Sequence, residues 1–474
     1  MMSSQLALLL LANALLLLIG LGLLPLFGVA RSPKQLAMRA GLAYLAGLAA
    51  GGVISASLAL VGVATGWPVL GALAAASLTA GAFRLNGSLR PRLPRKPGTV
   101  ILASLSAFGL LAFFVHAGRA FAVAPLLNFD GWAIWALKGH MLALLGWADP
   151  GFFANRQAFI IHREYPLLLP SLEAIDIRAM GEFNVQLLHV QLLLFAPAAV
   201  TAFASLLSDR TAAVVLWPSL LALATAPGLL GELYTARADL PLAIFFSVGA
   251  VAAGRWLLTG EGWALALAAL FFGAACLTKS EGALFALAAV VALGLQLIRD
   301  CPRRLVPLAV AAAAALCMLL PWRIFLFVHD LHETDYHFSD SFDLGYVSGR
   351  LNRGPTALGA LLESFVDPRH WSLLGPLFLV ATAAALLARR GGLAWYGLTL
   401  ILLGLAGLTW VYIISPISLP SYLHETTDRV TASLVLAGAA LAPLLASEAQ
   451  EASMRSHRRT RRPATAPAAT EHGA

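Results

Sequence analysis

The chain has 474 residues, of which 59% are hydrophobic and 12% are charged, and its formal net charge is +8. Soluble domains contain about 25% charged residues, so this composition excludes an ordinary soluble enzyme and indicates an integral membrane protein. The apolar residues come in blocks of roughly 17 to 25, the length of a membrane-spanning α-helix. A β-barrel would instead show short segments of alternating hydrophobicity.

About 13 membrane-spanning helices are predicted, so the fold class is an all-α polytopic membrane protein. The first apolar block, "LALLLLANALLLLIGLGLLPLFGVA", lacks the basic start and the A-x-A site of a signal peptide, and we expect it to be a retained helix. The predicted helices start near residues 5, 40, 68, 99, 184, 211, 239, 262, 282, 305, 371, 392 and 430.

The hydrophilic segments between these helices fall alternately on two sides that differ in charge. One side holds "RLNGSLRPRLPRKPG", "RDCPRR" and the tail "RSHRRTRR", while most acidic residues lie on the other. Because Lys and Arg are enriched in cytoplasmic loops, we expect the N-terminus outside and the tail inside. The excess of basic residues then reflects topology and contact with anionic lipid, and no nucleic-acid partner is expected.

This topology divides the chain into three parts. Residues 1–98 contain N-terminal helices and a basic loop, 99–446 form the main membrane module, and 447–474 are an Arg-, Pro- and Ala-rich tail expected to be disordered. The long outer loops are 128–182, 329–370 and 414–429, which places the functional site on the outer face. The Ala- and Leu-rich composition indicates a bacterial chain, located in the plasma (inner) membrane.

The first outer loop contains "FDGWAIWALKGHMLALLGW", which predicts a short helix lying in the membrane interface. We expect Trp132 and Trp135 at headgroup depth and Lys138 reaching the water. Asp130 stands at the start of this segment. Two roles that do not exclude each other are open: a helix cap, since a carboxylate accepts hydrogen bonds from the free N–H groups at a helix start, and a functional acid at the membrane surface.

A second acid follows in "HREYPLLLP", where Glu164 and Tyr165 precede an apolar run at the same membrane level as Asp130. The alternative is a solvated loop in which Glu164 pairs with Arg163, a contact of little energetic weight.

Two further segments bring charge to the outer ends of helices. In "YTARADLPLAIFF", Asp239 suits a helix start and Arg237 faces the same outer water. In "CLTKSEGALF", Lys279 lies in a tight turn between apolar helices, so it needs an anionic partner, either Glu281 or a ligand phosphate.

The last helix is preceded by "SYLHETTDRVTASL". The guanidinium of Arg429 is suited to bind a phosphate in a bidentate manner, and a pairing with Asp428 or Glu425 is the alternative.

Other signals for chemistry are weak. The segment "HDLHETDYHFSD" crowds His329, Asp330, His332 and His337 without a fixed ligand spacing, so no metal site is predicted there. The sequence contains no P-loop, no G-x-S-x-G and no dinucleotide fingerprint.

Taken in order, four of these segments resemble the GT-C glycosyltransferases. The resemblance is to the dolichyl-phosphate-mannose protein mannosyltransferases (family 39 type) and their bacterial relatives, and it covers most of 128–435. The motifs are "NFDGWAIWALKGHML", "HREYPLLLP", "YTARADLPLAIFF" and "LTKSEGALFAL", with "HETTDRVTASL" as a looser fifth.

The resemblance implies an enzyme that takes a sugar from a polyprenyl-phosphate carrier at the outer leaflet and transfers it to a hydroxyl of a lipid, glycan or protein. It implies that Asp130 is the catalytic base, with Glu164 as a second acid before Tyr165, and that Lys279 and Arg429 hold the carrier phosphate. Membrane lipids are the other expected partners. The remaining candidates for substrate binding are Tyr165, Arg237, Asp239 and Glu281.

The residue types suit this chemistry on their own. Cleavage of the anomeric C–O bond releases a phosphate monoester, so nearby cations stabilise charge that develops in the transition state. A partly desolvated carboxylate is a stronger base than one in water. A divalent ion shared by Asp130 and Glu164 is an open alternative for the cofactor.

Two other classes of function stay open. A transporter or flippase for lipid-linked or anionic solutes would use the same charges along a path, and charges in the middle of spans would favour it. A structural membrane subunit would merely pair the outer acids and bases.

Overall fold

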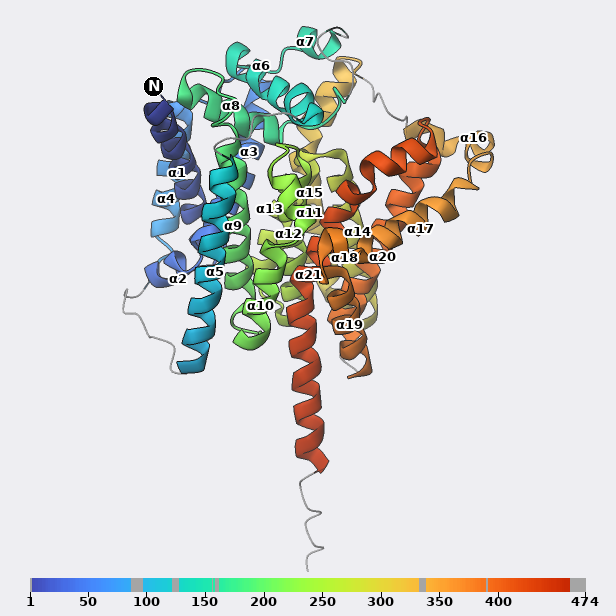
Figure 1. Ribbon diagram of the computed structural model, residues 1–474. Coiled ribbons are helices and arrows are strands. Elements are labelled where there is room, and N and C mark those ends of the chain that lie inside the picture. The colour runs from blue at the N-terminus through green and yellow to red at the C-terminus, as the bar shows by residue number, and fades with distance from the viewer. Residues whose placement is uncertain are drawn as a thin grey trace, which may run out of the picture.

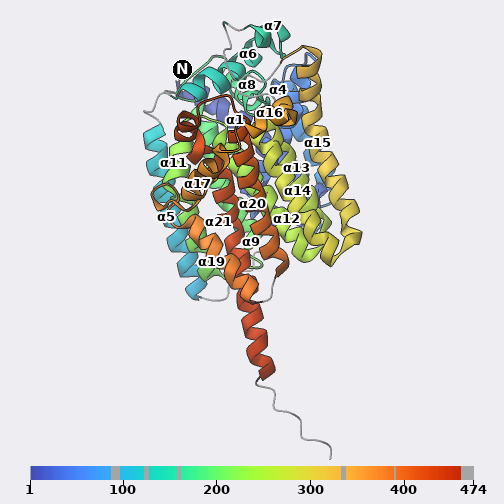
Figure 2. The ribbon, with the colours of Figure 1, turned by 90° about the vertical axis from the view of Figure 1, so that its right-hand side faces the viewer.

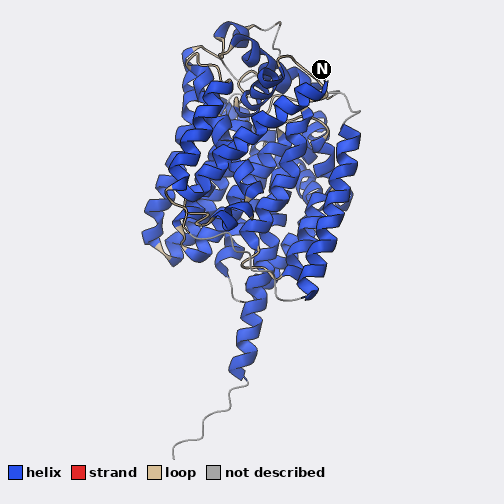
Figure 3. Cartoon of the chain, turned by 90° about the vertical axis from the view of Figure 1, so that its left-hand side faces the viewer, coloured by secondary structure: helices blue, strands red, loops and turns tan. Residues whose placement is uncertain are grey.

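The computed structural model describes residues 2–86, 97–121, 128–155, 157, 162–331, 338–388 and 391–460. These residues form a bundle of helices (Figure 1) and contain no β-strand (Figure 3). The predicted basic loop is described only up to Asn86 and from Pro97, and the last part of the tail, 461–474, also lies outside the described residues.

Nine helices among the described residues are long and apolar enough to cross a membrane, and eleven spans result if each of two bent pairs is counted as one. The chain is therefore a polytopic α-helical membrane protein. The nine are α1 (Met2–Leu26), α3 (Ala40–Leu60), α5 (Pro97–Phe121), α9 (His189–Leu207), α12 (Asp239–Thr259), α14 (Ser280–Asp300), α15 (Leu305–Val328), α20 (Gly391–Ile414) and α21 (Leu419–Thr460).

The remaining apolar helices are bent or short. The pair formed by α10 (Ala213–Ala224) and α11 (Pro227–Leu233) bends by 50°. Proline disfavours helical backbone at the residue before it, and Ala226 is accordingly extended. The other bent set is α17 (Arg353–Val366), α18 (Pro368–Trp371) and α19 (Leu374–Leu387), and the short apolar helices are α4 (Trp67–Ala82) and α13 (Gly262–Thr278).

The last helix differs from its prediction at both ends. It begins at Leu419 rather than near 430, and it continues to Thr460, past the start of the expected disordered tail at 447. The segment "ASEAQEASMR" is rich in Ala, Glu and Gln, residues with high helix propensity, and it directly continues a membrane span. The helix therefore has no local reason to stop at the membrane surface.

Short helices occupy residues 131–180, where the sequence predicts helices between two membrane spans. They lie at the end of the bundle that holds the N-terminus, which we call the loop end, while α21 extends at the opposite end, the tail end (Figure 1). They are η1 (Gly131–Ala136), α6 (Leu137–Leu145), α7 (Pro150–Ala154) and α8 (Leu168–Met180), and α16 (Leu344–Ser348) lies at the same end (Figure 2).

Helix α12 forms the centre of the bundle. Every residue from Asp239 to Trp256 is buried, and the helix packs against α13 and α21. Helices α17, α19 and α20 cover the other side of α21 (Figure 2). This packing fixes the distance between Asp239, the first residue of α12, and the part of α21 nearest the loop end.

Helices α1 and α3 approach each other at a pair of glycines. A Cβ on Gly20 would lie 1.7 Å from the carbonyl oxygen of Ala43, and one on Gly47 would lie 1.8 Å from that of Leu16. Small residues permit such backbone contact between membrane helices. This contact fastens the first helix to the rest of the bundle.

Gly47→Ala should therefore lower the stability of the protein. Overpacking typically costs about 1–3 kcal/mol, because the added methyl group forces α1 and α3 apart. Thermal unfolding in detergent measures the effect, and Gly71→Ala is the control, since a Cβ there meets nothing within 4 Å. Equal unfolding temperatures for the two variants would contradict the close packing.

Candidate functional site

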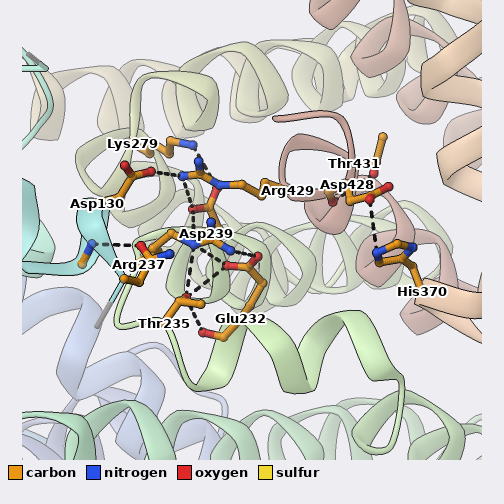
Figure 4. Close-up of polar contacts among 12 residues, drawn as sticks. Asp130, Glu232, Thr235, Arg237, Asp239, Lys279, His370, Asp428, Arg429 and Thr431 are labelled. Carbon is orange, nitrogen blue, oxygen red and sulfur yellow. Dashed lines mark hydrogen bonds and ion pairs between the residues drawn. The ribbon is translucent and has the colours of Figure 1, made fainter. Parts of the chain in front are cut away.

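Four segments that are distant in the sequence bring charged side chains together near the loop end (Figure 4). Asp130 directly precedes η1, Asp239 is the first residue of α12, Lys279 lies between α13 and α14, and Arg429 belongs to α21. All four were candidates from the sequence. Together with Glu232, Arg237 and Glu281, which contact them, they form a group that we call the ionic cluster.

Asp239 is the innermost member of the ionic cluster, with 2% of its side chain exposed. Its Oδ1 lies 2.9 Å from the Nζ of Lys279, and its Oδ2 lies 3.2 Å from the Nη2 of Arg429. The same Nη2 atom lies 2.6 Å from the Oδ2 of Asp130. Arg429 therefore bridges a buried carboxylate and a partly exposed one.

The turn that carries Lys279 depends on a glycine. Lys279 is extended and separates α13 from α14, and a Cβ on Gly282 would lie 1.9 Å from the carbonyl oxygen of Ala275. Only a glycine allows so tight a turn. The turn also places Glu281 with its Oε1 3.0 Å from the Nζ of Lys279, so the expected anionic partner is present.

Arg237 and Glu232 extend the ionic cluster. The Nε of Arg237 lies 3.2 Å from an oxygen of Glu232 and 3.9 Å from the Oδ2 of Asp239, and it also donates to the hydroxyl of Thr235 at 3.2 Å. Glu232 was not a candidate. Glu232 stands near the end of the apolar helix α11 in "GELYTARAD", five residues before Arg237, and this position is the signal that could have identified it.

Exposure falls from the edge to the centre of the ionic cluster. The side chains of Asp130 and Arg429 are 22% and 19% exposed, against 6% for Lys279. Burial alone would lower the pKa of Lys279, but the charges of Asp239 and Glu281 raise it above its ordinary value. The lysine is therefore charged, and the water-facing groups are Asp130 and Arg429.

The ionic cluster contains more acids than bases. Its cations are Arg237, Lys279 and Arg429, and its carboxylates are Asp130, Glu232, Asp239 and Glu281. Each cation already contacts at least one carboxylate, so an anionic ligand has to replace or share an existing partner.

Tyr165 connects a second group of residues to this cluster. Lys138 is fully buried and donates to the carbonyl oxygens of His162 and Tyr165, at 2.8 Å and 2.9 Å. The ring of Tyr165 stacks on Trp135 with centroids 5.4 Å apart, and its centroid lies 5.9 Å from the Nζ of Lys138 and 6.0 Å from that of Lys279. Tyr165 thus borders the ionic cluster, as its candidate role in substrate binding requires.

Glu164 belongs to this second group rather than to the ionic cluster. Its carboxylate is 3.8 Å from the Nδ1 of His162, and its carbonyl accepts a hydrogen bond from the Nε1 of Trp322 at 2.9 Å. No contact recorded among the described residues joins it to Asp130. The pairing of the two acids in catalysis stays a prediction, and Asp239 is the acid that shares a cation with Asp130.

The structure also bears on the helix-cap role of Asp130 and on the pairing of Arg429 with its neighbour Asp428. Asp130 makes no side-chain cap; the side chain of Asn128 instead accepts from the N–H of Gly131 at 3.2 Å. Arg429 does not pair with its neighbour Asp428, which contacts His370 at 3.1 Å. Both residues face the ionic cluster.

The two tryptophans expected at headgroup depth differ in their exposure. Trp132 is 50% exposed, but Trp135 is 1% exposed and Lys138 is buried, so the prediction that Lys138 reaches the water is wrong. The physical reason is that the segment packs inward, where two backbone carbonyls accept hydrogen bonds from the Nζ of Lys138.

A third polar group was not predicted. Asp176 on α8 accepts a hydrogen bond from Asn13 of α1 at 3.0 Å, and Tyr44 donates to Asn13 at 2.6 Å. Burial raises the pKa of Glu173 and Asp176 well above the usual range of carboxyl groups. Two acids in "PSLEAIDI", within an apolar run, were the available signal.

Metal ligation receives no support from the part of the chain that is described, which contains no group of three or more His, Cys, Asp or Glu arranged to hold an ion. The ring of His329 contacts that of Phe325 in a tilted arrangement, with centroids 4.6 Å apart, and His332 and His337 lie outside the described residues.

Comparison of the chain with protein-family models, curated proteins and solved structures finds no match.

Lys279→Met should destabilise the protein by about 3–5 kcal/mol, the usual cost of removing one partner of a buried ion pair, because it leaves Asp239 with less positive charge around it. Adding Asp239→Asn should recover part of this loss. Unfolding in detergent measures both variants. Single and double variants that lose the same stability would contradict the direct pairing.

The stability of the protein should also depend on Lys138 and pH. Burial lowers the pKa of Lys138 from 10.5 to about 7, with Glu164 opposing the shift. Above pH 7 the unfolded chain then holds more protons at this position than the folded one, so stability rises with pH, by at most about 1.4 kcal/mol per unit. Below pH 7 this dependence ends.

The measurement is the unfolding temperature between pH 7 and pH 9. The increase over this range should be smaller in Lys138→Met than in the wild type, while Lys34→Met, at the other end of the bundle, should leave it unchanged. An unaltered slope in Lys138→Met would contradict the buried, neutral lysine.

Proposed function

We propose that the protein is a membrane glycosyltransferase that moves a sugar from a polyprenyl-phosphate carrier to an acceptor hydroxyl. The acceptor is a lipid, a glycan or a protein. The reaction takes place on the extracytoplasmic face of a bacterial plasma (inner) membrane, with the N-terminus outside and the end of α21 in the cytoplasm.

The observation that carries this proposal is the contact between Arg429 and the carboxylates of Asp130 and Asp239. It places a partly exposed acid beside a cation, on the side of the bundle that holds the long loops; Asp130 and Asp239 lie at helix starts, and Arg429 lies within α21. A lipid-bound donor and a polar acceptor meet only at such a boundary.

The proposed reaction uses this contact directly. The donor phosphate replaces Asp130 as the partner of the Arg429 guanidinium, with Lys279 beside it. This exchange frees the Oδ2 of Asp130. The acceptor oxygen attacks the anomeric carbon and gives its proton to Asp130, while the C–O bond to the phosphate breaks and its electron pair stays on the phosphate oxygen. The cations stabilise that charge. One displacement of this kind inverts the anomeric configuration.

The other candidates take supporting roles in this proposal. Asp239 and Glu281 fix Lys279, and Tyr165 offers an aromatic face next to it for the sugar. Glu164, placed with His162, is proposed to shape the loop rather than to assist Asp130.

An apolar cavity next to the ionic cluster supports a lipid-borne donor. Its lining includes Leu233 and Leu240, which directly follow Glu232 and Asp239 in the sequence, and Leu436 of α21. Its volume of about 30 Å³ is far smaller than a prenyl chain, so side chains of α11, α12 and α21 would have to move apart to admit one.

A transporter or flippase for lipid-linked or anionic solutes is the second candidate. The buried acids Glu173 and Asp176, whose pKa is raised by burial, are the observation that favours it, since protonatable groups inside a bundle are typical of proton relays. The position of the ionic cluster near the loop end, with Asp130 and Arg429 partly exposed, favours the enzyme.

The test is sugar transfer by purified protein in lipid vesicles, with a panel of polyprenyl-phosphate sugars and hydroxyl acceptors. Asp130→Asn should lower transfer by about 10²–10⁴-fold, the usual loss for a general base. Asp149→Asn is the matched control, because Asp149 lies in the same loop and caps α7, a role that asparagine keeps.

Equal transfer by wild type and Asp130→Asn would remove Asp130 from the mechanism. Absence of transfer with every donor, together with movement of labelled lipid or solute across the vesicle membrane, would replace the enzyme with the transporter.

A further inference from the structure

A polar cavity, separate from the apolar one described above, lies at the tail end of the bundle, away from the ionic cluster. Its volume is about 450 Å³, and it is bordered by the segment between α1 and α3 and by the turn between α12 and α13. Its lining includes Arg31, Arg39, Arg255, Glu261 and Trp263. Glu261, with 44% of its side chain exposed, marks the side that is open to water.

Arg255 is already neutralised. Its Nη1 lies 2.6 Å from one oxygen of Asp209, its Nη2 contacts the other, and its Nε lies 3.5 Å from Glu261. Its guanidinium also stacks over Trp263, with the Cζ atom 4.9 Å from the ring centroid. This arginine forms a fixed wall of the cavity.

Arg31 and Arg39, unlike Arg255, are not neutralised by a carboxylate in the part of the chain that the structure describes. Among the described residues, neither side chain has a recorded ion pair or hydrogen bond, and the Cζ of Arg39 lies 6.0 Å from the ring of Trp263. Burial and the charge of Arg255 lower the pKa of Arg39, which means that its charged form lacks full compensation. Two arginines on the wall of an open cavity thus retain the capacity to bind an anion.

We propose that this cavity binds a phosphate group, carried by an anionic lipid or present as free phosphate, through Arg31 and Arg39. Arginine presents a planar set of donors that matches phosphate oxygens. The cavity is located between the ends of membrane helices, where phospholipid head groups lie, and basic pockets of this kind recognise anionic head groups. Trp263 provides an amphipathic ring suited to the same depth.

The test uses the full-length protein in detergent, titrated with phosphatidylglycerol, with phosphatidylcholine and with inorganic phosphate. The unfolding temperature at each concentration gives an apparent affinity. The variant is Arg31→Gln/Arg39→Gln. The matched control is Arg210→Gln/Arg303→Gln, which removes two exposed arginines outside the cavity lining.

We expect phosphatidylglycerol, but not phosphatidylcholine, to raise the unfolding temperature of the wild type and of the control. The cavity variant should bind at least about tenfold more weakly, since each basic residue near a membrane surface contributes about 1 kcal/mol. Each variant is compared with its own unliganded unfolding temperature, so a change in basal stability does not enter the result.

The phosphate titration identifies the source of the group. If inorganic phosphate raises the unfolding temperature and the rise depends on Arg31 and Arg39, the cavity binds free phosphate. If only phosphatidylglycerol raises the unfolding temperature, the cavity binds a lipid. No anion-dependent shift in the wild type, or equal losses in the cavity variant and the control, would overturn the proposal.

Discussion

Arg429 joins a carboxylate of the loop helices to a carboxylate of the innermost helix. Because Asp239 is 2% exposed, its charge is stable only with cations beside it, and Lys279 and Arg429 supply them from two other segments. The same arginine then reaches outward to Asp130. This contact thus connects the segment that carries Asp130 to a charge that the core has to compensate.

This arrangement depends on packing far from the charges. Helix α12 is buried from Asp239 to Trp256 and packs against α21, so the distance between Asp239 and Arg429 is set by the apolar faces of two long helices. The turn at Gly282 holds Lys279 with equal rigidity. The fold thus holds the cations of the ionic cluster in fixed positions, and an anionic ligand has to replace or share the carboxylates that already contact them.

Composition and the lengths of the apolar blocks were sufficient to predict a polytopic helical protein and the approximate start of most helices. The rule of charge compensation was sufficient to predict that Lys279 has an acidic partner. The particular pairs could not be predicted: in the sequence Arg429 stands next to Asp428, but helical neighbours at i and i+1 point in different directions, and three-dimensional packing brings it to Asp130 and Asp239 instead. In the same way, nothing local indicates that Lys138 turns inward, because its partners are backbone carbonyls of a later segment.

The two ends of the chain differ in their surroundings. Near the N-terminus, Gln5 accepts a hydrogen bond from Asn184 at 3.0 Å, so α1 begins against the segment between α8 and α9, whereas α21 runs clear of the bundle to Thr460 at the opposite end (Figure 1). An affinity tag or fluorescent reporter fused ahead of α1 would lie at the loop end, the end of the bundle near which the ionic cluster lies (Figure 1). The same fusion placed after α21 would hang away from it, which makes the carboxyl end the appropriate handle for purification and for reporting which compartment it occupies.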